Sequence, residues 1–235
     1  MILPDNEGQG NIWAIVPVKR LSLAKQRLAP VLSRSERAEL ARTMLHDVLT
    51  ALCATPQLAG FIVVSVDPAV AQLARLFDAR VVGDVVETGV NAAVKQGLRT
   101  LDPSSAGALI VPADVPFATA ADLQAVIAEL GRSVVVLVPA LSDGGTNTLA
   151  MRRPDLIAPS FGDDSFARHR ALARGAGVAC GTVRSEGLGR DIDCPADLAP
   201  WAGARKFSLT AALLAEFKLA DRSGVTAFPV SKRHR

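Results

Sequence analysis

The stretch "IWAIVPVKRLSLAKQRL", residues 12–28, passes directly from an apolar run into a basic loop. Residues 12–18 are almost continuously apolar, as in a strand that is covered on both faces. The loop lies where an open α/β sheet places its phosphate-binding turn, but it lacks the glycines of the dinucleotide-binding G-x-G-x-x-G turn. The basic residues of this loop are Lys19, Arg20, Lys25 and Arg27. We therefore expect a phosphate ligand held by side-chain charge, with Arg20 equally well explained as an exposed helix start.

The rest of the chain alternates apolar runs with helical patterns. The further apolar runs are residues 60–66, 79–83, 107–112 and 133–140. The helical patterns are residues 33–54, 67–77, 89–101, 119–131 and 163–175. This alternation predicts one α/β domain, residues 1–204, whose mostly parallel central sheet is flanked by helices and binds ligands beyond the carboxyl ends of its strands. We expect residues 205–235 to form a helical extension and tail.

Composition excludes several classes of protein. The chain has 235 residues, of which 49% are hydrophobic, and no run of about 18 uncharged apolar residues that could span a membrane. Its net charge is +3, but only 4% of residues are aromatic and there is no tyrosine, which argues against a surface that stacks nucleic-acid bases. The three cysteines lack the spacing of a zinc site or a disulfide framework. We expect a soluble, cytoplasmic protein that binds neither nucleic acid nor membranes.

Acidic residues follow the fourth apolar run and recur near the end of the domain. Asp114 in "VPADVPF" lies between two prolines that restrict the backbone. Asp191 and Asp193 in "GRDIDCPADL" alternate, so they would project from the same face of an extended segment. Three carboxylates at one sheet edge would repel each other unless a cation neutralised them, so we predict a Mg²⁺ site if the fold brings them together. Asp197 is sufficiently explained as a helix-start acid.

Two further segments offer polar groups for a small anion. Thr146 in "DGGTNT" is either a turn-forming residue or a ligand contact. Gly162 opens a helix start at which backbone N–H groups and the Ser165 hydroxyl would form an anion site. No histidine is placed to act as a general base, and we expect His169 to be solvated in a basic helix turn.

Taken together, these motifs resemble those of a known family. "IVPVKRLSLAKQRLAPVLSRSERAELARTML", "GVNAAVKQGL", "VPADVPF", "GGTNTLAMR", "FGDDSFARH" and "LGRDIDCPADL", in this order over residues 11–200, are similar to the CofC/FbiD guanylyltransferases of coenzyme F-420 biosynthesis. The resemblance implies a Rossmann-like nucleotidyltransferase domain. It also implies transfer of GMP from GTP to 2-phospho-L-lactate, phosphoenolpyruvate or 3-phospho-D-glycerate, with release of pyrophosphate and with Mg²⁺ as cofactor.

The motifs and the resemblance together give one set of expected site residues. Nucleotide contacts are expected at Pro17, Lys19, Lys25, Arg27, Asn91 and Pro112, with Asn91 against the nucleoside. Catalytic roles are expected for Lys19, Lys25 and Asp114, and metal ligation for Asp114, Asp191 and Asp193. The phospho-acid is expected at Thr146, Gly162 and Ser165. Gln26 departs from the small hydroxyl residue that relatives often carry, and residues 205–235 have no family role, although they would suit packing in a homodimer.

Two other functions fit parts of the sequence. A nucleotidyltransferase for another phosphorylated acceptor, such as molybdopterin or a sugar phosphate, would need the same basic loop and carboxylates. A non-catalytic nucleotide-binding or nucleic-acid-binding module would fit the positive charge, but not the three carboxylates. The three phospho-acids differ by a hydroxyl, a double bond and the position of one phosphate, which the sequence does not distinguish.

Overall fold

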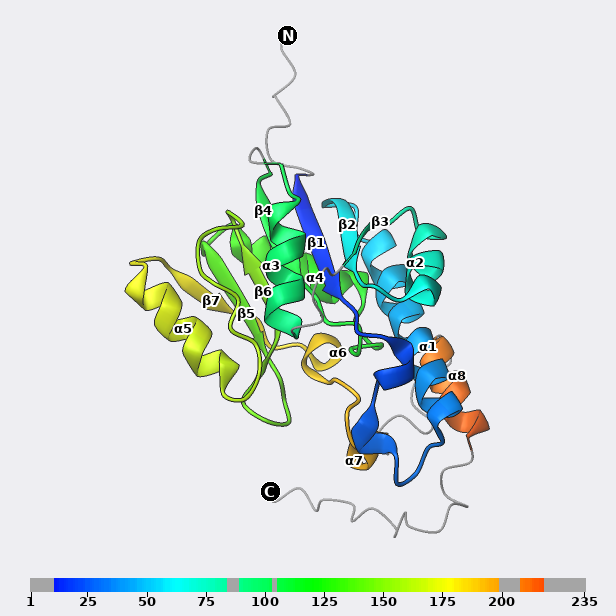
Figure 1. The fold of residues 1–235 in the computed structure, drawn as a ribbon. Coiled ribbons are helices and arrows are strands. Elements are labelled where there is room, and N and C mark those ends of the chain that lie inside the picture. Colours follow the sequence, from blue (N-terminus) through cyan, green and yellow to red (C-terminus); the bar gives the residue numbers. More distant parts are fainter. Residues whose placement is uncertain (1–10, 84–88, 103–104, 199–207, 218–235) are drawn as a thin grey trace, which may run out of the picture.

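A computed structural model describes residues 11–83, 89–102, 105–198 and 208–217, and Figure 1 shows the arrangement of their elements. The strands are β1 (Ile12–Pro17), β2 (Leu58–Val64), β3 (Arg80–Val82), β4 (Gly107–Ile110), β5 (Val135–Pro139), β6 (Thr146–Met151) and β7 (Cys180–Thr182). The α-helices are α1 (Arg34–Cys53), α2 (Pro68–Arg75), α3 (Val90–Arg99), α4 (Ala120–Leu130), α5 (Ser165–Gly175), α6 (Glu186–Gly189), α7 (Pro195–Leu198) and α8 (Leu209–Glu216). Two short 3₁₀ turns, η1 (Leu21–Leu23) and η2 (Gln26–Leu28), form most of the first loop.

The strands form one sheet in the order β3-β2-β1-β4-β6-β5-β7. β1 pairs in parallel with β2 and β4, β2 pairs in parallel with β3, and β5 pairs in parallel with β7. β6 is antiparallel to both of its neighbours, β4 and β5. The prediction of a mostly parallel α/β sheet is confirmed, and all five predicted strands are present. Two strands were not predicted: β6, which begins inside the stretch interpreted as a turn, and the three-residue β7.

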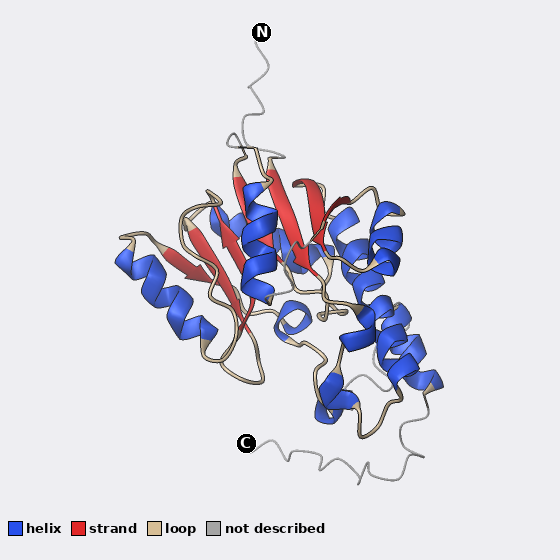
Figure 2. Ribbon diagram, viewed as in Figure 1, coloured by secondary structure: helices blue, strands red, loops and turns tan. Residues whose placement is uncertain are grey.

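Helices cover the sheet on both faces, as Figure 2 shows. Buried side chains of α1, α2 and α4 pack on one face, and those of α3 and α5 pack on the other. α3 lies very close to the sheet, because a Cβ atom added at Gly97 would come within 2.7 Å of the Ile15 side chain. α1 begins with a capping box, since Ser33 accepts a hydrogen bond from the Glu36 N–H and Glu36 accepts one from the Ser33 N–H.

The last described helix, α8, packs on α1. Asp47 of α1 accepts hydrogen bonds from the Ser208 hydroxyl at 2.7 Å and the Thr210 N–H at 2.8 Å, so an α1 side chain caps the start of α8. Leu214 of α8 is buried. α8 therefore packs on the same chain, and the rest of the segment 205–235 that was expected to form an extension and tail lies outside the described residues. None of the described helices is long and apolar enough to cross a membrane.

Candidate active site

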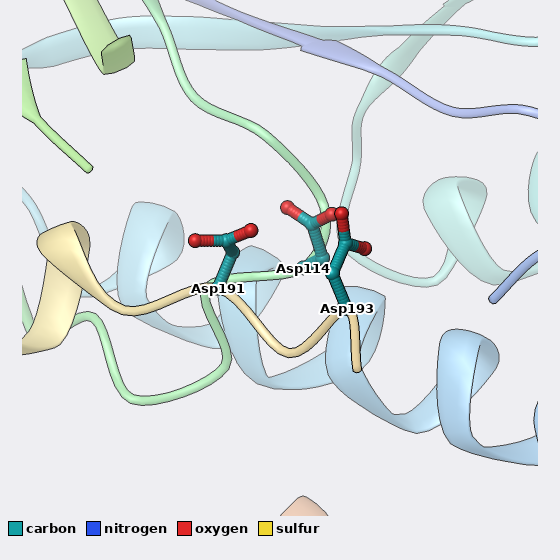
Figure 3. A group of neighbouring side chains, drawn as sticks. All are labelled: Asp114, Asp191 and Asp193. Carbon is teal, nitrogen blue, oxygen red and sulfur yellow. The ribbon is translucent and has the colours of Figure 1, made fainter. Parts of the chain in front are cut away.

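The three predicted metal ligands meet at the carboxyl edge of the sheet. Asp114 follows β4, and Asp191 and Asp193 lie on the segment between α6 and α7. A backbone hydrogen bond of 3.0 Å from the Ile192 N–H to the Asp114 carbonyl joins the two segments. One carboxylate oxygen from each residue lies within 4.8 Å of the other two, and Figure 3 shows the side chains directed to the same side. The fold therefore brings together the three carboxylates on which the predicted metal site depends.

Nearby side chains hold the acidic segment in place. The Asp197 carboxylate accepts hydrogen bonds from the backbone N–H groups of Asp193 at 2.9 Å and Cys194 at 2.7 Å, which is the helix-start role expected for it. Asn147 of β6 donates to the Leu188 carbonyl at 3.0 Å and to the Asp191 carboxylate at 3.4 Å. The sequence analysis did not single out Asn147, because its role depends on β6, which was missed.

Lys25 forms ion pairs with two of the carboxylates. Its Nζ lies 2.7 Å from Asp114 Oδ2 and 2.6 Å from Asp193 Oδ1, and its side chain is only 7% exposed. Burial lowers the pKa of Lys25, but the charges of Asp114 and Asp193 outweigh burial and raise that pKa above its usual value. Burial also opposes ionisation of Asp193, but Lys25, Arg27 and Lys19 hold the pKa of that carboxyl below its usual value. The lysine backbone is in the left-handed region (φ 52°), which turns the basic loop toward the acids.

Asp191 is the carboxylate that Lys25 does not pair with. Burial, followed by the charge of Asp114, raises the pKa of Asp191 to about 6. Like charges this close oppose ionisation, and a cation held among the oxygens would restore it. Three carboxylate oxygens are also the ligand type that Mg²⁺ prefers. The donor set therefore fits a divalent cation that shares the site with the Lys25 ammonium.

A pocket of about 940 Å³ lies between the basic loop and the carboxylates. The expected site residues that line it are Pro17, Lys19, Lys25, Arg27, Pro112, Asp114 and Asp193. Gly89, Val90 and Ala93 at the start of α3 form another part of its wall, but Asn91 does not line it. The Asp67 carboxylate accepts a hydrogen bond of 2.8 Å from the Leu21 N–H and so anchors the first loop to the start of α2. Asp67 before Pro68 is typical of a helix start. Its hydrogen bond to Leu21 joins residues far apart in the sequence, so no local pattern indicates that contact.

The predicted phospho-acid residues meet between β6 and α5. The Ser165 hydroxyl accepts a hydrogen bond of 2.8 Å from the Thr146 N–H, and the Thr146 hydroxyl lies 3.0 Å from His169 Nδ1. His169 Nε2 accepts from the Ser160 N–H at 2.9 Å, so the neutral ring donates from Nδ1 to Thr146. His169 is fully buried, and burial followed by Arg168 lowers its pKa to about 4. The expectation of a solvated His169 is wrong, because its side of α5 faces the sheet.

Asn91 contacts Phe161 through hydrogen bonds, and Gly162 follows Phe161 in the chain. The Asn91 side chain accepts a hydrogen bond of 2.7 Å from the Phe161 N–H and donates one of 3.1 Å to the Phe161 carbonyl. Gly162 has φ 119°, a conformation that side chains rarely adopt, where the chain turns into α5. Thr146, Gly162 and Ser165 are thus close together, but they do not line the 940 Å³ pocket.

Proteins of similar sequence carry related names. The chain is 42% identical over 197 residues to a phosphoenolpyruvate guanylyltransferase of Sphaerobacter thermophilus, covering 81% of this chain and 92% of that protein. It is 36% identical to a 3-phospho-D-glycerate guanylyltransferase of Phenylobacterium zucineum, over 87% of this chain and 96% of that one. It is 35% identical to a 2-phospho-L-lactate guanylyltransferase of Methanothermobacter thermautotrophicus, over 79% and 81% of the two chains.

Solved structures share the fold at lower identity. A structure from Desulfovibrio desulfuricans described as a nucleotide-diphospho-sugar transferase matches with a TM-score of 0.73 and 18% identity, over 88% of this chain and 95% of that one. A nucleotidyl transferase of Methanothermobacter thermautotrophicus matches with a TM-score of 0.58 and 20% identity, over 80% and 94%. The model of the CofC-like guanylyl transferase family matches residues 12–201. With a basic loop facing three carboxylates at the edge of a nucleotidyltransferase sheet, the chain belongs to the family of CofC-like guanylyl transferases.

Proposed function

We propose that the protein transfers GMP from GTP to a three-carbon phospho-acid and releases pyrophosphate, as an early step of coenzyme F-420 biosynthesis. The acceptor is phosphoenolpyruvate, 3-phospho-D-glycerate or 2-phospho-L-lactate, the acids for which the relatives are named. The observation that carries the proposal is the pocket of about 940 Å³ with lysines and arginines on one wall and aspartates on the other. Such a pocket suits a triphosphate that is bound together with a cation.

The basic loop would hold the triphosphate. Lys19 and Arg27 line the pocket, and both are close enough to Asp193 to lower its pKa. Lys25 lies beside them, where its ammonium can contact a phosphate oxygen while staying close to Asp114. These three cations would neutralise charge that develops on the departing pyrophosphate.

Asp114, Asp191 and Asp193 would hold a magnesium ion. Bound there, the ion would supply Lewis-acid polarisation of the α-phosphate and a template for the phosphate oxygens. The fit rests on the three converging carboxylate oxygens and on the raised pKa of Asp191, which a neighbouring positive charge would lower again.

Thr146, Gly162 and Ser165 would bind the phospho-acid. An oxygen of its phosphate forms the new bond to the α-phosphorus of GTP while the bond to the β-phosphate oxygen breaks. That oxygen is already ionised at neutral pH, so the reaction needs no general base. His169 fits this absence of a base, because both of its ring nitrogens are engaged in hydrogen bonds within the protein.

The test is pyrophosphate release from GTP and Mg²⁺ with each of the three acids in separate reactions. One acid should support turnover, and Asp114→Asn should abolish it. Asp155→Asn is a matched control, because Asp155 is 77% exposed and pairs only with Arg153 among the described ion pairs. Near-normal turnover by Asp114→Asn would contradict the assignment.

The same assay distinguishes the other functions. Turnover with molybdopterin or a sugar phosphate, but with none of the three acids, would show a different acceptor. Exchange of GTP for ATP tests the base preference. Binding of polynucleotide that weakens steeply with salt, without consumption of GTP, would show a binding module instead.

A further inference from the structure

The segment Ser160–Phe161 is held by side chains rather than by secondary structure. His169 Nε2 accepts from the Ser160 N–H at 2.9 Å, and Arg168 Nη2 donates to the Ser160 carbonyl at 3.1 Å. Asn91 accepts from the Phe161 N–H at 2.7 Å and donates to the Phe161 carbonyl at 3.1 Å. All four polar backbone groups of the two residues therefore have side-chain partners. These side chains therefore supply the hydrogen-bond partners that backbone groups would otherwise find in a helix or strand.

Asn91 stands between two parts of the site. Its neighbours Gly89, Val90 and Ala93 line the 940 Å³ pocket, so the first turn of α3 is part of the proposed nucleotide site. The Asn91 side chain itself makes its two hydrogen bonds to Phe161, which precedes Gly162 of the proposed phospho-acid site. One amide thus joins the wall of the first site to the backbone of the second.

Ser160, the other residue of the segment, is held by a hydrogen bond to His169. His169 holds the Ser160 N–H with one ring nitrogen and the Thr146 hydroxyl with the other. The Phe161 ring also packs edge-on against His169, with ring centroids 5.0 Å apart. Movement of Phe161 would therefore displace Gly162 and disturb the contacts of Thr146. Through its two hydrogen bonds, Asn91 of α3 holds the backbone of Phe161 in this position.

We propose that Asn91 is a positioning residue that aligns the phospho-acid site with the nucleotide site by fixing the backbone of Phe161. This inference rests on the proposed function, and it differs from the nucleoside contact that family resemblance implies for Asn91. Alignment of this kind matters because a transfer step requires the attacking oxygen and the α-phosphorus to meet within narrow limits of distance and angle.

Two substitutions test the proposal. Asn91→Ala removes both hydrogen bonds, and Asn91→Asp keeps the size and the acceptor but turns an oxygen toward the Phe161 carbonyl. Both variants should raise KM for the phospho-acid by about tenfold or more and lower kcat, because Asn91→Ala loses both hydrogen bonds and Asn91→Asp loses one and places two oxygens against each other. The Kd for GTP in the absence of acid should change by less than about twofold, because Asn91 does not line the pocket. Gln72→Ala, which removes an exposed amide on α2, is the matched control.

Hydrogen exchange gives a readout that needs no substrate. The amide of Phe161 should be protected in the wild type and should exchange at least about tenfold faster in Asn91→Ala, which removes its acceptor, while amides of β1 stay unchanged. Thermal melting establishes that each variant is folded. A tenfold weaker binding of GTP with an unchanged KM for the acid would overturn the proposal in favour of a nucleoside contact, and unchanged exchange at Phe161 in Asn91→Ala would also overturn it. If the wild type uses none of the three acids, the proposed function fails, but GTP binding and exchange still decide the role of Asn91.

Discussion

Replacement of Lys25 by methionine should destabilise the protein in a way that a divalent cation partly reverses. The substitution keeps the length of the side chain and removes an ammonium that lies 2.7 Å from Asp114 and 2.6 Å from Asp193. Removal of one partner from a fully buried ion pair costs about 3–5 kcal/mol. Because the side chains of Asp114 and Asp193 are 28% and 42% exposed, water screens part of this loss, and we expect about 2–3 kcal/mol. For a chain of this size that corresponds to a drop in Tm of about 4–6 °C.

The cation dependence follows from the same charges. Without Lys25, three carboxylates face one another, so Mg²⁺ should bind the variant in the absence of nucleotide. A concentration about ten times Kd would restore about 1.4 kcal/mol. Wild-type protein should respond less, since its ammonium already neutralises two of the acids. Melting followed by circular dichroism, with and without Mg²⁺, measures both effects.

The pH dependence of the difference between wild type and Lys25→Met has a defined sign. The pKa of Lys25 is raised, so its stabilisation is present below the ordinary value of 10.5 and is lost as pH rises through the higher folded value. The pKa of Asp193 is lowered, so its contribution is present above the ordinary value of 3.8 and is lost as pH falls through the lower folded value. The difference in Tm should therefore stay constant across neutral pH. Lys95→Met is the control, since Lys95 is exposed on α3 and forms no ion pair with the described residues. Equal melting of the two variants would refute the reasoning.

Two further substitutions test other parts of the structure. Asp191→Asn should raise Tm at pH 7.5 in cation-free buffer by an amount equivalent to about 1–2 kcal/mol. The pKa of Asp191 is raised to about 6 in the folded protein, so the stabilisation that its protonated carboxyl provides is fully present below pH 3.8 and is lost as pH rises through 6. The gain should shrink at pH 5 in the same melting assay, and an equal gain at both pH values would contradict this. Asp47→Ala removes the acceptor for Ser208 and Thr210, so exchange of the α8 amides should accelerate, with a loss of about 1–2 kcal/mol in overall stability. Unchanged exchange relative to Glu39→Ala, an exposed α1 control, would show that Asp47 does not hold α8.

The central sheet could be predicted because its parallel strands are buried on both faces. Ala14, Ile15 and Val16 of β1 are all fully buried, and such continuous apolar runs stand out in a sequence. β6 begins with polar Thr146 and Asn147 after two glycines, which looks like a turn until the antiparallel partners are known. Only tertiary pairing makes this segment a strand.

The sequence also indicated which carboxylates are candidate metal ligands, but not that Lys25 forms ion pairs with two of them. The rule that ligands gather at the carboxyl ends of strands made Asp114 and Asp193 candidates, but the sequence alone does not show that they meet. The ion pairs of Lys25 depend on a left-handed backbone at a residue that is not glycine or asparagine, and no local pattern indicates it. Burial of His169 has a signal in retrospect, because His169 and Ala173 are four residues apart on the side of α5 that faces the sheet.

The attachment of Ser160–Phe161 by side chains has a consequence for how such an enzyme changes over generations. Strand pairing uses backbone atoms that every residue carries, so exchange of a side chain leaves it intact. A segment held by Asn91, Arg168 and His169 depends on the identity of those residues, and a single amino-acid replacement at any of them resets its position. Natural selection could therefore shift the proposed acid site from outside the pocket, without changing the three aspartates that are proposed to hold the metal ion.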